Sequence, residues 1–212
     1  MSDQHTFRIR PVFPDEWGEA EYDALSAFPS ARDFTLANWQ GDDARGTHGT
    51  GALLPHPALA KAFLTFNNHV ATGSTLSKRI RELLILRIGW LRCSEYEFMQ
   101  HVVLGRRAGL SDEEIDRITR GPDAQGWDPV DAALLRATDE LCRDAFIQDD
   151  TWAVLAEHFT EQQLLDLITA VGCYEVAAMI FKTLKLPMEC GVPRMDPETR
   201  ARMYAQQGNV NA

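Results

Sequence analysis

From Pro57 to about residue 184 the chain repeats apolar residues at helical spacing almost without interruption. Leu59, Phe63 and Phe66 trace the first of these stripes. Apolar positions three and four residues apart lie on one face of an α-helix, where they can be buried together. No segment shows the strong alternation of apolar and polar residues that predicts a β-strand. The sequence therefore predicts an all-α fold.

Capping signals divide this periodic region into separate helices. Ser77 is a suitable N-cap, Ser111 and Glu114 form a capping-box pattern, and Gly109 is typical of a helix end. The connections between these helices are short. Helices are expected at about 57–73, 77–91, 94–107, 112–118, 129–146, 150–158, 161–171, 174–184 and 197–205.

Residues 1 to about 55 have a different composition, rich in Pro, Gly, Asp and other polar residues. One helix is expected there, over 16–28, and the polar stretch 40–51 is predicted to be a loop. Such a loop is either a solvated connector or a cover for a site. We therefore predict an N-terminal extension at 1–55, a helical domain at 56–190, and a C-terminal helix and tail at 191–212.

The charge balance restricts the partners of the chain. Thirty-one acidic and 21 basic residues give a formal net charge of -10. This charge repels phosphate backbones and anionic membrane surfaces, so we expect neither a nucleic-acid nor a membrane partner. An anionic small-molecule substrate would need a local cluster of positive charge. Four arginines near the middle of the chain are candidates: Arg79, Arg81, Arg87 and Arg92.

Two further features favour a cytoplasmic location. The N-terminus lacks the apolar core of a signal peptide, and no apolar run approaches the ~18 residues of a membrane span. The four cysteines are widely separated, without a CxxC pair or zinc-ligand spacing: Cys93, Cys142, Cys173 and Cys190. We expect them to be free thiols in a reducing compartment.

Three chemically active side chains fall on one face of the helix expected at 94–107. Ser94, Glu97 and His101 stand at positions i, i+3 and i+7, which places a hydroxyl, a carboxylate and an imidazole together. Glu82 lies upstream in an apolar segment, where an unpaired carboxylate would be costly. It either pairs with an Arg or a His inside a site or lies on an exposed stripe. These four residues form a candidate acid/base site.

A faint internal repeat relates residues 82–97 to residues 161–175. Each segment has an apolar helix, a Gly, and then a Cys followed by Tyr-Glu. The two segments align only with a gap, so the repeat is a weak indication of duplication.

The pattern of Glu82, a helix, and then Cys93-Ser94-x-Tyr96-Glu97-Phe98-x-x-His101-x-x-x-x-Arg106-x-Ala108-Gly109-Leu110-Ser111 resembles the carboxymuconolactone decarboxylase family. That family shares its fold with the alkylhydroperoxidase D proteins. The resemblance is specific over about residues 55–120. It implies an alkylhydroperoxidase D-like helical bundle that assembles into homo-oligomers, trimers or hexamers, and acts on a small molecule without a cofactor.

In the peroxidase branch of this fold the motif is a Glu, a CxxC pair and a His four residues after the second Cys. With His101 as the anchor, the Glu falls on Glu82, but the two cysteine positions fall on Ser94 and Glu97. Cys93 is one residue out of register, which turns it about 100° around the helix. The usual disulfide cycle therefore lacks both of its thiols.

The decarboxylase branch needs no CxxC pair. Loss of CO2 beside a lactone or carbonyl leaves an enolate-like carbanion that must receive a proton. The resemblance makes His101 the proton donor, since an imidazole exchanges protons near neutral pH, with Glu82 or Glu97 orienting it. Ser94 would bind the developing oxyanion. Substrate binding is assigned to three further residues: Arg87, Arg81 and Tyr96.

Other interpretations stay open. A thiol-dependent alkyl hydroperoxide reductase would use Cys93, and a non-catalytic oligomeric binding protein would keep only the scaffold. Ser94 as a helix cap, Cys93 as a buried core residue and Glu97 as a partner of Arg92 are structural alternatives. A metal held by carboxylates and His101 is conceivable, but we predict no metal. Nucleotide-binding, serine-hydrolase and HExxH motifs are absent from the sequence.

Overall fold

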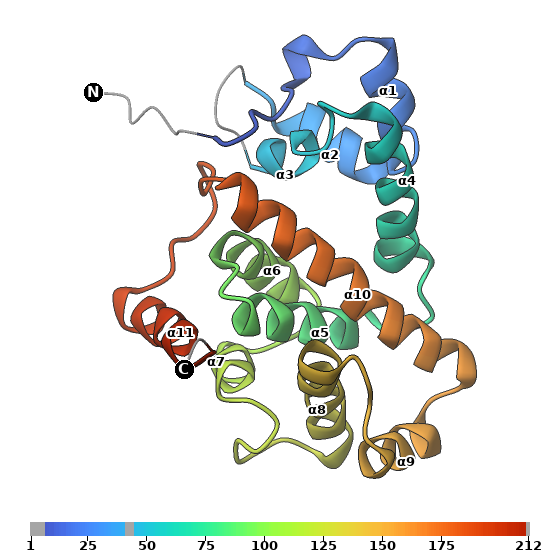
Figure 1. Cartoon of the computed structure of the whole chain (residues 1–212), viewed down its shortest axis with the longest axis vertical. Helices are drawn as coiled ribbons and strands as arrows, with labels where there is room; N and C mark the ends of the chain where they lie inside the picture. The colour runs from blue at the N-terminus through green and yellow to red at the C-terminus, as the bar shows by residue number, and fades with distance from the viewer. Residues whose placement is uncertain (1–6, 41–44, 211–212) are drawn as a thin grey trace. The chain divides into compact units, whose positions relative to one another are not determined.

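The computed structural model describes residues 7–40 and 45–210, with side chains as far as residue 205. Within these residues every regular element is helical, which confirms the all-α prediction (Figure 1). A short 3₁₀ helix, η1 (Pro14–Glu16), and a short π-helix, η2 (His69–Gly73), accompany the α-helices. The α-helices are α1 (Glu19–Leu25), α2 (Pro29–Asn38), α3 (Thr47–Gly51), α4 (Pro57–Asn68), α5 (Lys78–Leu91), α6 (Glu95–Arg107), α7 (Asp112–Arg120), α8 (Pro129–Asp144), α9 (Asp149–His158), α10 (Glu161–Leu184) and α11 (Pro197–Val210).

The chain forms two compact units. The first runs to Gly73 and includes Met179–Arg194, and the second contains Ser74–Ala178 and the chain from Met195 onward. The domain boundaries expected at residues 55 and 190 stay a prediction, and the two compact units divide the chain at other residues. The sequence grouped α4 with the helices after it because their periodicity is continuous, whereas α4 packs against α1 in the first unit.

The first unit has a small apolar core to which Trp17, Leu25, Leu54 and Leu64 contribute. The fully buried carboxylate of Glu189 accepts hydrogen bonds from the backbone N–H groups of Gly46 and His48, both at 2.6 Å. These bonds hold the segment that contains Glu189 against the start of α3.

Two short helices in this unit correct the sequence prediction. α2 follows α1 where no second helix was expected, and α3 occupies part of the stretch 40–51 that was predicted to be a loop. Residues 41–44 of that stretch lie outside the described residues. Neither helix has a strong apolar stripe, and α3 is held by Glu189, a contact more than 140 residues away in sequence. Local periodicity could not reveal it.

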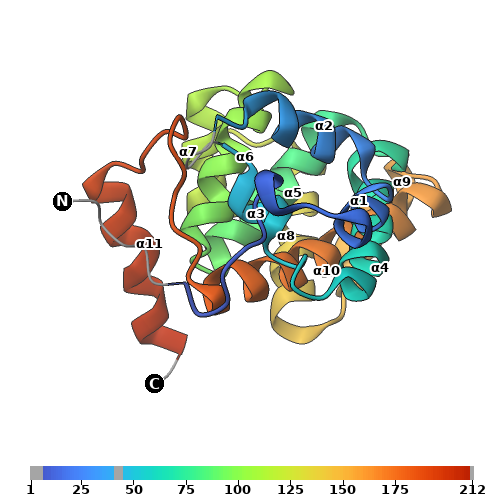
Figure 2. The same ribbon diagram turned by 90° about the horizontal axis from the view of Figure 1, so that it is seen from above.

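The second unit is built around α5, whose residues from Glu82 to Trp90 are all buried. α6 lies beside α5 in both views (Figures 1 and 2), and α8 packs on α5 as well. Gly89 permits the close approach of α6, because a Cβ atom there would stand only 3.2 Å from backbone atoms of Phe98. The turn between the helices is tight, with Cys93 at φ +48° and the Ser94 N–H donating to the Gly89 carbonyl at 2.8 Å.

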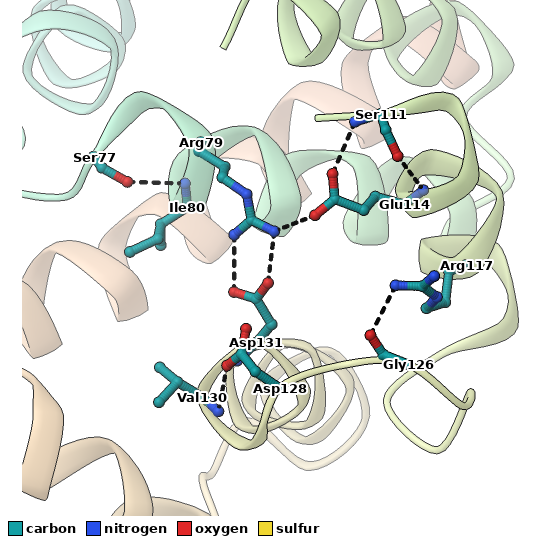
Figure 3. A network of polar contacts seen from close by, with 10 residues as sticks. All are labelled: Ser77, Arg79, Ile80, Ser111, Glu114, Arg117, Gly126, Asp128, Val130 and Asp131. Carbon is teal, nitrogen blue, oxygen red and sulfur yellow. Dashed lines mark hydrogen bonds and ion pairs between the residues drawn. The ribbon is translucent and has the colours of Figure 1, made fainter. Parts of the chain in front are cut away.

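Predicted helix caps are present on α5 and α7. The Ser77 hydroxyl accepts a hydrogen bond from the Ile80 N–H at 3.2 Å, and Ser111 and Glu114 form the expected reciprocal capping box. Figure 3 shows that the guanidinium of Arg79 lies between Glu114 and Asp131. Its two bonds to Asp131 measure 2.6 and 3.0 Å. Arg79 therefore ties α5 to α7 and α8.

α10 is one continuous helix of 24 residues, where the sequence predicted two helices separated near Gly172. By length and composition alone this helix could cross a membrane, which corrects the expectation that no such apolar run exists. Half of its apolar window is buried within the chain, as in a core helix. It also carries Asp166, which accepts hydrogen bonds from the N–H and hydroxyl of Thr75 at 2.6 and 2.7 Å.

Candidate functional site

The Glu82–His101 pair joins α5 to α6 in the second unit. Nδ1 of His101 lies 2.7 Å from Oε2 of Glu82. The exposed fractions of the two side chains are 12% and 5%, respectively. A carboxylate that accepts from Nδ1–H fixes the ring orientation and leaves Nε2 to exchange a proton with a ligand. The structure thus shows Glu82 buried and paired with His101, and not on an exposed stripe.

Two more side chains adjoin this pair. Nε of Arg81 lies 3.8 Å from the second carboxylate oxygen of Glu82, and its side chain is 12% exposed. Tyr174, from α10, packs edge-on against the His101 ring with the centroids 5.0 Å apart. Burial raises the pKa of Tyr174, and the charge of Glu82 raises it further, so the phenol is neutral. Tyr174 was missing from the sequence-based site, although the faint repeat of Cys-Tyr-Glu at 173–175 was a signal for it.

Ser94 and Glu97 are buried on α6 without hydrogen-bond partners among the described residues. Ser94 occupies the N-cap position of α6, but its side chain makes no capping bond. Burial raises the pKa of the Glu97 carboxyl well above its usual range, and the nearby Glu175 carboxylate raises it further. Arg92, considered as a partner for Glu97, binds Glu175 instead, at 2.7 and 2.8 Å.

Arg87 was predicted to bind the substrate carboxylate, but in the structure its guanidinium is hydrogen-bonded to other groups of the protein. Nε and Nη2 bind the Asp139 carboxylate at 2.6 and 2.8 Å, and Nη1 donates to the Ile118 carbonyl at 2.8 Å. Arg79 and Arg92 are likewise bound to carboxylates. Among the four candidate arginines, only Arg81 stands beside the Glu82–His101 pair.

The two remaining predicted residues are Tyr96 on α6 and Cys93 in the turn between α5 and α6. Tyr96 is buried on α6, with 7% of its surface exposed. Cys93 is also buried, and its thiol donates to the Met203 carbonyl of α11 at 3.0 Å. All four cysteines are free thiols, as predicted. Within the described part of the chain, no three His, Cys, Asp or Glu side chains are grouped so that they could hold a metal ion.

A separate hollow of about 530 Å³ lies against α11. Its lining residues are Met195, Pro197, Arg200, Ala201 and Tyr204. None of the predicted site residues lines it. The polar groups of Arg200 and Tyr204 both bind the Glu95 carboxylate, at 2.8 and 3.1 Å.

Comparison with known proteins gives one family and one fold. Residues 57–140 match the model of the carboxymuconolactone decarboxylase family. No curated protein sequence matches the chain. A solved structure of a protein of unknown function from Agrobacterium tumefaciens, named as a candidate antioxidant defence protein AhpD, has a TM-score of 0.60 and 22% identity. The match covers 64% of this chain and 94% of that one.

Two further solved structures are similar. A peroxidase-related protein from Silicibacter sp. has a TM-score of 0.60 and 16% identity, covering 67% of this chain and 78% of its own. A variant of the debrominase Bmp8 in complex with 2,3,4-tribromopyrrole has a TM-score of 0.65 and 10% identity, covering 97% and 98%. At these identities the likeness shows the fold alone. Residues 57–140, which carry Glu82 and His101, thus match the carboxymuconolactone decarboxylase family, and the chain has an alkylhydroperoxidase D-like all-α fold.

Proposed function

We propose that this protein is a cofactor-independent decarboxylase of a small carboxylated lactone or a related compound from aromatic catabolism. The observation that carries the proposal is the contact between His101 and Glu82, a buried imidazole oriented by a carboxylate at 2.7 Å. Such a pair moves a proton without a metal or a redox partner. Arg81, beside Glu82, supplies positive charge for the substrate carboxylate.

The reaction follows from these groups. The C–C bond to the carboxylate breaks, CO2 leaves, and the electron pair is delocalised onto the adjacent carbonyl as an enolate. Protonated His101 then delivers its Nε2 proton to the carbon that lost CO2, and the imidazole regains a proton from solvent. Tyr174 covers one side of the ring and helps to exclude water.

The hydroperoxide reductase remains the alternative from another class of enzyme. It would depend on Cys93, whose thiol is buried and bonded to a carbonyl of α11. Ser94 and Glu97 replace the two cysteines of the peroxidase motif. These contacts favour proton transfer over thiol chemistry. Peroxide turnover that is abolished in Cys93→Ser would support the alternative instead.

The test is proton NMR of a panel of carboxylated lactones and β-keto acids incubated in D2O. Wild type should release CO2 from one member and place deuterium on the neighbouring carbon, with activity reduced about 10²–10⁴-fold in His101→Ala. His158→Ala is the matched control, because His158 lies exposed on α9 and bonds only locally, to the Val154 carbonyl. Turnover that persists in His101→Ala would refute the assigned role of the pair.

A non-catalytic binding protein makes the opposite prediction, since its ligand affinity would survive both His101→Ala and Glu82→Ala. A cytoplasmic location, a homo-oligomeric state of three or six subunits and the absence of nucleic-acid and membrane partners belong to the same proposal. They are supported by the acidic charge and the family relationship.

A further inference from the structure

Three polar side-chain atoms in the site are left without hydrogen bonds. They are Oγ of Ser94 and both carboxyl oxygens of Glu97, and within the described residues no other buried side-chain oxygen or nitrogen lacks a partner. Ser94 is 0% exposed and Glu97 is 1% exposed. Leaving a buried polar group unpaired is costly, so native structures rarely contain one without a function. The cost here falls on two residues one helical turn apart.

Other buried glutamates of the same chain show the contrast. Glu140, 6% exposed, accepts hydrogen bonds from the Gln148 N–H and the Thr151 hydroxyl, both at 2.9 Å. Glu189 accepts from two backbone N–H groups. The fold therefore satisfies buried carboxyl groups elsewhere, and Glu97 is the exception.

The unpaired atoms adjoin the proton-transfer pair. Glu97 stands one turn before His101 on α6, and Ser94 stands one turn before Glu97. The Glu175 carboxylate of α10 acts electrostatically on Glu97, and the charges of both Glu82 and Glu97 act on the adjacent Tyr174. Arg92 neutralises part of the Glu175 charge.

These surroundings determine the protonation state of Glu97. Burial and the neighbouring negative charge raise the pKa of its carboxyl, which favours the neutral acid. A neutral carboxyl donates one O–H bond, and the Ser94 hydroxyl donates another. Two donors close together match a carbonyl oxygen, which has two lone pairs.

We propose that Ser94 and Glu97 together bind the carbonyl oxygen adjacent to the carboxylate that is lost. As the C–C bond breaks, the electron pair moves toward this oxygen, and the two O–H groups stabilise the developing negative charge. His101 supplies the proton to carbon. The inference rests on the proposed function, because it assigns the substrate's second functional group to the same site.

The first experiment compares thermal stability in four variants, Glu97→Gln, Glu97→Leu, Glu140→Gln and Glu140→Leu. Glu97→Leu should melt at or above the wild-type temperature, because it removes an unsatisfied buried group, whereas Glu140→Leu should melt lower. A fall in melting temperature for Glu97→Leu as large as for Glu140→Leu would show that Glu97 is a structural residue and would overturn the proposal.

The second experiment measures binding without turnover. The two compounds are paraconate and tetrahydrofuran-3-carboxylate, which has the same ring and carboxylate but no carbonyl. Paraconate is a γ-butyrolactone whose carbonyl is one CH2 group away from the carboxylate-bearing carbon, so it cannot lose CO2 to an enolate. NMR titration should show that wild type binds paraconate roughly tenfold more tightly. Glu97→Leu and Ser94→Ala should lose this preference, and Glu97→Gln, which keeps an N–H donor, should retain it.

Binding in His101→Ala separates the two proposals. The preference for paraconate should persist there, because the carbonyl contacts do not involve the imidazole. If wild type shows no preference, the carbonyl subsite is wrong even when decarboxylation is confirmed. If the preference is present but no compound is decarboxylated, the subsite stands and the proposed reaction fails.

The pH dependence gives an independent readout. Glu97 ionises near its ordinary pKa of 4.5 in the unfolded chain but at a higher pH in the folded protein. The folded state then binds the additional proton, so the unfolding free energy of wild type relative to Glu97→Gln should fall as the pH rises above 4.5. A difference that is constant with pH would contradict a neutral Glu97.

Discussion

At the scale of single residues, the structure separates charges that hold the fold from charges that are available for chemistry. Arg79, Arg87 and Arg92 resemble one another in sequence as candidates for binding an anion, yet each is bound to a carboxylate. Arg81 differs because it lies next to Glu82, which is hydrogen-bonded to His101. The contacts of these four arginines, and not their residue type, distinguish Arg81 from the other three.

Arg87→Ala tests this distinction. The substitution leaves the Asp139 carboxylate without its partner and removes a donor from the Ile118 carbonyl, so it should lower the unfolding free energy by about 3–5 kcal/mol. Urea denaturation measures the loss. Arg136→Ala, which removes an exposed pair with Asp123, should cost at most about 1 kcal/mol. If Arg87→Ala kept its stability but lost activity, Arg87 would instead bind the substrate, as the sequence predicted.

At the scale of the helix, N-cap residues that look equivalent in sequence behave differently. Ser77 and Ser111 accept the hydrogen bonds expected of a cap, whereas Ser94 makes none. The tight turn at Cys93 and Gly89 places Ser94 inside the unit, where its hydroxyl lies among buried side chains. The same residue type therefore caps α5 and α7 but makes no capping bond at the start of α6.

Ser111→Ala should lower the unfolding free energy by about 1 kcal/mol, because the first turn of α7 loses the bond to the Glu114 N–H. Ser94→Ala should leave the unfolding free energy unchanged or slightly raised, since no capping bond is lost. Chemical denaturation of the two variants, side by side, provides the measurement. Equal losses would mean that Ser94 caps α6 in solution.

At the scale of the whole molecule, α10 leaves an apolar stripe uncovered. The exposed fractions of three apolar residues on this helix are 63% for Leu165, 42% for Val176 and 60% for Met179. Leu164, Leu167 and Val171 of the same helix lie buried in the chain itself. An apolar stripe of this kind is typical of an interface between copies.

Sedimentation velocity should therefore show wild type as an oligomer of the 23.8 kDa chain. The double variant Leu165→Lys with Val176→Lys should shift it toward the monomer, because the added charges would be desolvated in the interface. Phe146→Lys, an exposed apolar position outside α10, is the control and should keep the oligomeric mass. If wild type sediments as a monomer, the exposed apolar residues of α10 do not form an interface between copies of the chain.

The sequence by itself determined the helical class and most helix limits in the second unit. It did so because apolar spacing, Ser caps and terminal glycines act within one or two turns of the residues concerned. It also placed Ser94, Glu97 and His101 on one helical face, since that depends only on the period of the helix.

Tertiary structure decided everything that depends on contacts between distant segments. It gave His101 the partner Glu82, brought Tyr174 against the imidazole, and diverted Arg87 to Asp139. It also kept α10 continuous through Gly172, because the helix packs apolar residues along its length, which outweighs the local weakness of one glycine. These outcomes arise from packing across 19 to 73 residues of sequence, a range that local patterns do not encode.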